Sequence, residues 1–131
     1  MGKVTRCSII IYDDFNTVLI AEVGKGKINS PKLWCVIGKG IKGKETEDKC
    51  ITKAVDKALK CNIFDLTPFK EYVLDEEGGD ILSVYSGKIK EAVTCHADIN
   101  KVKWISESEM NIYDFAVNEK EVLLDFFKNM K

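Results

Sequence analysis

The sequence predicts a single domain of mixed α/β class that spans residues 1–131. Three observations support this prediction. The composition, 45% apolar and 31% charged, is that of an ordinary folded domain with one core. Short apolar runs bounded by Gly, Pro, Asn and Asp recur along the chain and are typical of strands. Two segments have apolar residues at helical spacing, which predicts helices packed on a sheet.

The N-terminal third predicts three strands. Residues 3–14 (KVTRCSIIIYDD) predict the first strand, and a DDFN turn leads into TVLIAEV at 17–23, so that the two strands form a hairpin. The polar segment GKGKINSPK at 24–32 predicts a loop. LWCVI at 33–37 is a short apolar run, which predicts the third strand.

The clearest helix is predicted at about 46–61. Thr46 can cap it, and Glu47 and Asp48 fall in the first turn, where carboxylates interact favourably with the positive end of the helix dipole. Apolar residues then form one stripe at helical spacing: Cys50, Ile51, Ala54, Val55, Ala58 and Leu59.

The C-terminal half predicts three further strands and a second helix. PFKEYVLD at 68–75 and DILSVYSGKIK at 80–90 predict two strands joined around Glu77-Gly78-Gly79, and KVKWIS at 101–106 predicts another. SESEM is a short turn or helix start. The tail at 117–130 has apolar residues at helical spacing and predicts a docked terminal helix.

Composition also excludes several classes of protein. The net charge of -1 argues against a general nucleic-acid binder. No apolar run approaches the roughly 20 residues that span a bilayer, and the N-terminus has no signal-peptide cleavage pattern, so a cytoplasmic location is expected. The five cysteines form no C-x-x-C pair and are expected to be buried free thiols. The single histidine, His96, is expected at the surface.

The segment between the third strand and the helix is rich in glycine and lysine. Gly38, Gly43 and Lys44 match the G-x-x-x-x-G-K pattern of a phosphate-binding P-loop. Two features argue against that interpretation. Glu45 stands where a hydroxyl should bind Mg²⁺. Two strands are also predicted before the strand that leads into the loop, whereas a mononucleotide-binding sheet has its P-loop after the first strand.

The layout of the whole chain resembles the Nudix hydrolase family. Its box runs Gly, five residues, Glu, seven residues, Arg-Glu-apolar-x-Glu-Glu-x-Gly-apolar, after a Trp-containing segment. Without a gap, Trp34 corresponds to the family's Trp, Gly38 to the Gly before the box, Glu45 to the first box Glu and Lys53 to the box Arg. KVKWISESEM resembles the family's later strand and turn. The resemblance implies an α/β/α sandwich with a mixed central sheet, the box helix at about 46–61 and a C-terminal helix.

The chain departs from this pattern at the positions that carry the family's chemistry. The three glutamates that hold Mg²⁺ or Mn²⁺ in the family correspond to Ala54, Lys57 and Ala58, on one helix face. Two methyl groups and an ammonium are not ligands for these cations. The box glycines correspond to Lys39 and Lys60. We therefore expect the usual metal site to be absent and no cofactor to be needed.

Three functions stay open at this point. The first is a Nudix-fold protein that binds a nucleotide, another phosphorylated molecule or a protein partner. The second is a divergent hydrolase of a nucleoside diphosphate derivative that uses Mg²⁺ or Mn²⁺ held by displaced ligands, with Glu45, Glu76 and Glu77 as its candidates. The third is an unrelated α/β domain.

For binding, the candidate phosphate ligands are Gly38, Lys39, Gly40, Lys42, Gly43, Lys44 and Lys57. Lys25 and Lys27 could line the opening of the same phosphate site. Glu45 and Lys53 are expected to pair and to hold the loop against the helix. The alternative interpretation is that these lysines only make the surface soluble.

Overall fold

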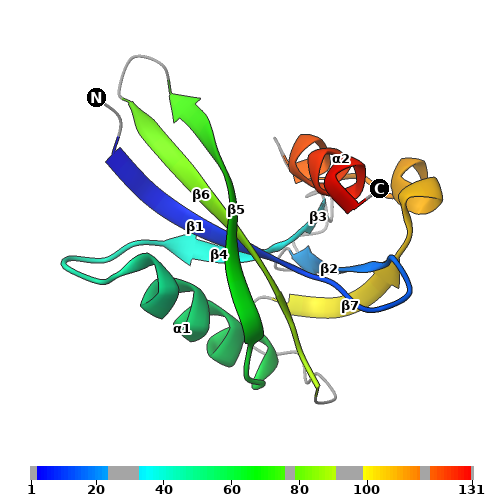
Figure 1. Ribbon diagram of the computed structural model, residues 1–131, viewed down its shortest axis with the longest axis horizontal. Helices are drawn as coiled ribbons and strands as arrows, with labels where there is room; N and C mark the ends of the chain where they lie inside the picture. Colours follow the sequence, from blue (N-terminus) through cyan, green and yellow to red (C-terminus); the bar gives the residue numbers. More distant parts are fainter. Residues whose placement is uncertain (1–2, 24–32, 76–78, 91–98, 116–118, 131) are drawn as a thin grey trace.

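The computed structural model describes residues 3–23, 33–75, 79–90, 99–115 and 119–130 (Figure 1). The elements follow in the order β1 (Lys3–Ile11), β2 (Val18–Val23), β3 (Leu33–Cys35), β4 (Ile37–Gly40), α1 (Glu47–Leu59), β5 (Phe64–Asp75), β6 (Asp80–Lys88), β7 (Ile99–Ile105), the 3₁₀ helix η1 (Glu107–Ile112) and α2 (Glu119–Met130).

The strands form two sheets. One has the order β4-β1-β6-β5, in which β1 and β6 are parallel and the other pairs antiparallel, and the second has the order β3-β2-β7. The predicted hairpin between residues 3–14 and 17–23 is wrong as a strand pair. The turn does form, since the Asp13 carboxylate accepts hydrogen bonds from the backbone N–H groups of Phe15 and Thr17. However, β4 and β6 occupy both edges of β1, so β2 joins the other sheet and only Tyr12 and Val18 form a bridge.

The predicted strand at 33–37 is also divided. Leu33–Cys35 pairs with β2 in one sheet, and Ile37–Gly40 pairs with β1 in the other. The chain crosses between the sheets at Val36, which is buried. The apolar run therefore supplies all of β3 but only Ile37 of β4. The rest of β4, residues 38–40, belongs to the segment that was predicted as a loop.

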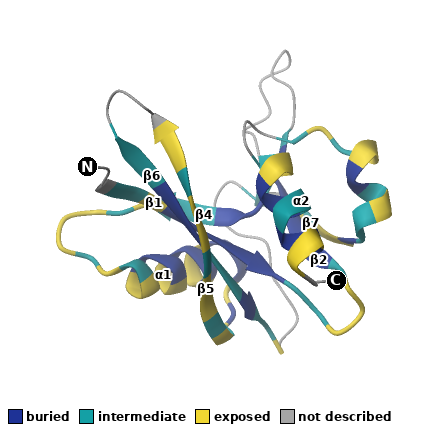
Figure 2. Ribbon diagram, turned by 45° about the horizontal axis from the view of Figure 1, so that its top comes forward, coloured by how far each residue is buried: buried dark blue, intermediate teal, exposed yellow. Residues whose placement is uncertain are grey.

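Two apolar cores lie on opposite faces of the strands. Figure 2 shows buried residues along β1 and in α1 and α2. Alternate side chains of a strand point to opposite faces, so Ile9 and Ile11 of β1 pack in the core under α1. Ile10 packs in the other core with Phe126 of α2. This three-layer arrangement is the predicted α/β/α sandwich.

Helix α1 agrees with the prediction in extent and in its buried face. The Thr46 hydroxyl accepts a hydrogen bond from the Lys49 backbone N–H, and Lys60 ends the helix in the left-handed conformation with φ 54°. The six apolar residues of the predicted stripe are the buried ones. Cys50 is among them, and it and Cys7 are buried free thiols as predicted. Cys61 is also buried, whereas Cys35 is partly exposed.

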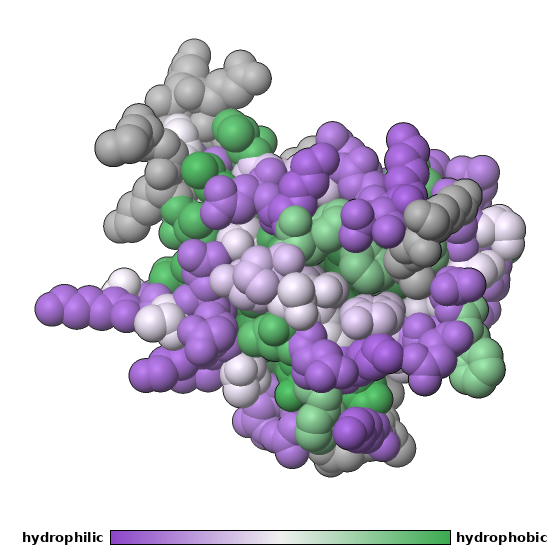
Figure 3. Space-filling view, in the orientation of Figure 1, coloured by the Kyte–Doolittle hydropathy of each residue, from purple (hydrophilic) through white to green (hydrophobic). Residues whose placement is uncertain are grey.

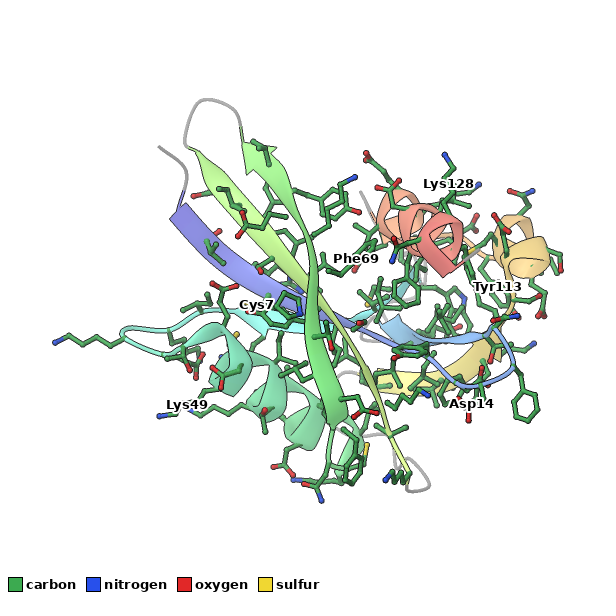
Figure 4. All side chains as sticks on the ribbon, in the orientation of Figure 1. Cys7, Asp14, Lys49, Phe69, Tyr113 and Lys128 are labelled. Carbon is green, nitrogen blue, oxygen red and sulfur yellow. The ribbon has the colours of Figure 1, made fainter. Side chains whose placement is uncertain are left out.

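The C-terminal half agrees with the prediction more closely. Strands β5 and β6 pair antiparallel, β7 follows, and α2 begins at Glu119. Helix α2 packs on β5, where the rings of Phe69 and Phe126 lie 5.3 Å apart and Tyr72 donates a 2.8 Å hydrogen bond to Asp125 (Figure 4). Among the helices that the structure describes, none has the length and apolar character to cross a membrane.

Candidate functional site

A cavity of about 600 Å³ lies between β4 and α1. Helix α1 contributes Ala54, Lys57 and Ala58 to one wall, so the helical spacing does bring these three side chains to one cavity. The rest of the lining comes mainly from the chain segment that contains β3 and β4: Cys35, Val36, Ile37, Gly38, Lys39, Gly40, Ile41 and Lys42, with Arg6 and Ile99 beside them. None of these described lining residues has a carboxylate.

A second hollow, of about 620 Å³, adjoins the cavity and is lined almost wholly by lysine. We call it the lysine hollow. Its lining consists of Lys39, Lys42, Lys44, Glu45, Lys49, Lys53 and Lys57. Lys39, Lys42 and Lys57 line both spaces and mark where the two meet. The structure thus brings together the four lysines predicted as phosphate ligands.

The sequence interpretation missed Lys49 and did not count Lys53 among the ligand candidates. The signal was present, because Lys49, Lys53 and Lys57 recur every four residues, which places them on one helix face. Figure 4 shows Lys49 on the outer side of α1, near the loop, and Figure 3 shows hydrophilic surface where this loop projects. Lys25 and Lys27 lie outside the described residues.

Among the described residues that line the lysine hollow, Glu45 is the one carboxylate, and two ammonium groups hold it. Lys39 Nζ lies 2.6 Å from Oε1 and Lys53 Nζ lies 2.9 Å from Oε2, and the Glu45 side chain is only 7% exposed. Hydrogen bonds from Lys39 and Lys53 lower the pKa of Glu45 to about 2. Each carboxylate oxygen therefore bonds a lysine, and the two ion pairs connect Glu45 in the loop to β4 through Lys39 and to α1 through Lys53.

The backbone of the loop depends on two glycines. A Cβ at Gly38 would lie 2.5 Å from Ser8 Oγ and 2.6 Å from the Cys7 carbonyl oxygen, so β4 can approach β1 only with glycine there. Gly43 has φ +60°, a conformation that favours glycine. The turn around it is closed by a 3.2 Å hydrogen bond from the Glu45 N–H to the Lys42 carbonyl.

The pairing of β4 with β1 also fixes the direction of backbone N–H groups. The Ile41 N–H donates to the Thr5 carbonyl at 2.9 Å. Since hydrogen-bonding direction alternates along an antiparallel strand, the N–H groups of Gly38 and Gly40 point away from β1, toward the free edge of β4. Both residues line the cavity.

A further polar group lies next to the cavity and was not predicted. The Glu119 carboxyl accepts a hydrogen bond from the Val36 N–H. Burial raises the pKa of Glu119 to about 7, although Arg6 opposes that rise. Burial and the Glu119 charge also raise the pKa of the Cys35 thiol to about 12. No sequence pattern indicated this group, because its members come from three distant parts of the chain.

The raised pKa of Glu119 predicts a specific dependence of stability on pH. A carboxyl with a folded pKa above its ordinary 4.5 stabilises the fold when protonated, and this contribution is lost as pH rises from about 4.5 to about 7. The amide of Glu119→Gln does not ionise. As pH rises across that range, the free energy of unfolding of this variant should therefore increase by up to about 3 kcal/mol relative to that of the unaltered protein. Urea unfolding at pH 4.5 and 8 measures it. Glu121→Gln, on the exposed side of the same helix, is the control, and equal pH profiles would contradict the assignment.

Other acidic residues were candidates for displaced metal ligands. Glu76 and Glu77 lie outside the described residues. So do Cys95, which was expected to be buried, and His96, which was expected at the surface. Within the part of the chain that the structure describes, no three His, Cys, Asp or Glu side chains come together in a group able to hold a metal ion.

The chain resembles known proteins in structure, although no significant match was found in sequence. No family model matches the chain, and no curated protein matches it significantly in sequence. A structure from a study of MutT from Aliivibrio salmonicida and Vibrio cholerae superposes with a TM-score of 0.80 at 11% identity, over 96% of this chain and 98% of that one. The NUDIX domain of Shewanella oneidensis NrtR, complexed with ADP ribose, gives 0.76 at 14% identity, over 100% and 90%. A NUDIX family hydrolase from Clostridium perfringens gives 0.73 at 13% identity, over the full length of both.

The chain therefore has the Nudix fold. The likeness covers nearly the whole domain and confirms the predicted architecture, including the box helix and the C-terminal helix. At such low identity the likeness concerns the fold alone, and fold does not determine function. The function has to be argued from the residues of the cavity and the lysine hollow.

Proposed function

We propose that this Nudix-fold protein binds a phosphorylated ligand through the lysines at the opening of its cavity, without a divalent metal and without hydrolysing the ligand in the family's usual way. The main support is the lining of one hollow, where the described residues are six lysines and a single carboxylate that is already paired. Such a surface attracts phosphate oxygens and repels divalent cations.

The charges of the hollow support anion binding. With six lysines and one glutamate, its lining has a formal charge of +5. Within the described residues, Lys42, Lys44, Lys49 and Lys57 make no salt bridge, so their ammonium groups are available to a ligand. Lysine binds phosphate as a mobile point charge with three donors.

The adjoining cavity supports a ligand that also has a less polar part. Val36, Ile37 and Ile41 give it apolar walls, while Lys39, Lys42 and Lys57 stand at the junction with the lysine hollow. A nucleotide derivative combines an apolar ring with phosphates and fits this division. The NUDIX domain of NrtR, which has the same fold, is complexed with ADP ribose, and this molecule is a suitable first probe.

The residues at positions 54, 57 and 58 argue against the usual chemistry of the family. A divalent cation at a diphosphate neutralises charge and helps generate hydroxide, and it needs oxygen ligands. The cavity presents two methyl groups and an ammonium at these positions, and Glu45 is held by two lysines. The donor set therefore does not fit Mg²⁺ or Mn²⁺.

The alternative function is hydrolysis of a nucleoside diphosphate derivative with displaced metal ligands. It is favoured by the number of hydrolases among the proteins of the same fold. Glu45, Glu76 and Glu77 would then have to supply the metal site. Incubation with nucleoside triphosphates, nucleotide sugars and dinucleoside polyphosphates in Mg²⁺ or Mn²⁺ tests it, and we expect no phosphate release above background. Turnover that is lost in Glu76→Gln/Glu77→Gln would favour the alternative.

Binding itself is tested by calorimetric titration of ADP-ribose and pyrophosphate in the presence of a chelator. We expect measurable binding by the unaltered protein and a loss of at least about tenfold in Lys42→Gln/Lys57→Gln, because each charged hydrogen bond contributes more than 1 kcal/mol. Lys120→Gln/Lys128→Gln removes the same charge from exposed positions of α2 and should leave affinity unchanged. Equal affinities of the two double variants would contradict the proposed site.

A further inference from the structure

We infer that the lysine hollow holds an elongated oligophosphate chain in its metal-free form, so that Mg²⁺ competes with the protein for the ligand. This inference rests on the proposed function and adds the length and the ionic form of the bound anion. Three features support it: the arrangement of the lysines, their total charge, and the absence of an unpaired carboxylate among the described residues that line the hollow.

The lysines form two groups that are spread along the hollow. Helix α1 supplies Lys49, Lys53 and Lys57, and the segment before it supplies Lys39, Lys42 and Lys44. Residues four apart on a helix are separated by about 6 Å along the axis, so the helix group extends over about 12 Å. A single phosphate can reach only neighbouring members of such a row. A chain of phosphates can lie along it and contact lysines from both groups.

Total charge points to the same class of ligand. The lining of the hollow has a formal charge of +5. A phosphate chain has one charge on each internal phosphate and about 1.5 to 2 on each terminal one, which gives a chain of three about -4 to -5. Glu45 lies between the two groups, bonded to Lys39 from one and Lys53 from the other. Glu45 therefore connects the two groups of lysines while its carboxylate offsets only one of the six positive charges.

The side chains of the hollow favour a phosphate chain without bound Mg²⁺. Mg²⁺ on a phosphate chain is normally held by phosphate oxygens, waters and one or two carboxylates. The one carboxylate of the hollow has both oxygens bonded to lysine. A magnesium-bound chain brings two positive charges into a lysine-lined space and has fewer free oxygens for the ammonium groups. It should bind more weakly than the free chain.

Free inorganic oligophosphate and the triphosphate group of a nucleotide share this chemistry. The adjoining cavity distinguishes them, since only a nucleotide could place a ring among Val36, Ile37 and Ile41. Tripolyphosphate and ATP are therefore compared as probes. Both should bind without metal, and a higher affinity for ATP would show that the ring contributes.

The experiment is a calorimetric titration of phosphate, pyrophosphate, tripolyphosphate and ATP in chelator, followed by tripolyphosphate in excess Mg²⁺. We expect affinity to rise at least tenfold from pyrophosphate to tripolyphosphate and to fall at least tenfold with Mg²⁺. Lys44→Gln/Lys49→Gln alters residues that line only the hollow and should remove most of the gain with chain length. Lys120→Gln/Lys128→Gln is the control, and circular dichroism confirms that each variant is folded.

The possible failures are distinguishable. If pyrophosphate binds but tripolyphosphate binds no better, or if Mg²⁺ tightens binding, the inference is wrong while the proposed function stands. If no phosphorylated probe binds, both are wrong. A hexaglutamate peptide that binds as tightly as tripolyphosphate would also overturn the inference, because the hollow would then select an acidic peptide by charge alone.

Discussion

Ala54→Glu/Lys57→Glu/Ala58→Glu is expected to bind Mn²⁺ at least tenfold more tightly than the unaltered protein. These three residues line one wall of the cavity, and the spacing places three carboxylates on one helix face. The change adds three negative charges and removes one positive charge, and it supplies the oxygen ligands that a divalent cation needs. Electron paramagnetic resonance measures the free Mn²⁺ in a titration. The same variant should bind pyrophosphate more weakly in the absence of metal.

Ala54→Gln/Lys57→Gln/Ala58→Gln is the matched control, because it has side chains of the same size without the carboxylates. It should not gain Mn²⁺ binding. The cavity leaves room for the longer side chains, and circular dichroism establishes whether both variants fold. A folded glutamate variant with no more affinity for Mn²⁺ than its glutamine control would mean that this wall cannot hold a metal, and that our comparison of these positions with the family's metal ligands is wrong.

The second large effect is expected for Gly38→Ala. The added Cβ would meet Ser8 Oγ at 2.5 Å and the Cys7 carbonyl oxygen at 2.6 Å. Relief requires β4 to move away from β1, and overpacking of this kind costs about 1–3 kcal/mol. The free energy of unfolding, measured in urea, should fall by that amount. Phosphate affinity should fall as well, because Lys39 and Gly40 move with the strand.

Gly40→Ala provides the comparison within the same strand. There the nearest atom to a Cβ is the Thr5 carbonyl oxygen at 3.6 Å, an ordinary contact. Its stability should stay within about 0.5 kcal/mol of the unaltered protein, as for most substitutions without a steric conflict. If the two alanine variants were equally stable, the close approach of β4 to β1 at Gly38 would not be as the structure has it.

Local signals in the sequence predicted the helices well. Helix α1 has its cap at Thr46, acidic residues in its first turn and an apolar stripe, and all of these act within one segment. Strand pairing was predicted less well because partners are set by distant residues. The turn after β1 has the residues of a hairpin, but β4 and β6 occupy both edges of β1. Nothing within residues 3–23 indicates those partners.

In the candidate site, too, the features set within one segment could be predicted, and those set by distant residues could not. The lysines of the loop and Lys57 could be predicted because they lie in one continuous stretch, and the repeat of Lys49, Lys53 and Lys57 was also visible in the sequence. The ion pair of Glu45 with Lys53 was expected from the resemblance to the family's box, whereas the pair of Glu45 with Lys39 required the turn at Gly43 to be known. Glu119 could not be predicted as a neighbour of the cavity, since its place depends on how α2 docks.

We propose that the cavity between β4 and α1 binds its ligand without a divalent cation. Crystals of the unaltered protein soaked in Mn²⁺ test it most directly, because anomalous scattering locates the metal. We expect no Mn²⁺ in the cavity or the lysine hollow, and we expect Glu45 to remain bonded to Lys39 and Lys53. A Mn²⁺ ion coordinated there by α1 or by Glu45 would contradict it.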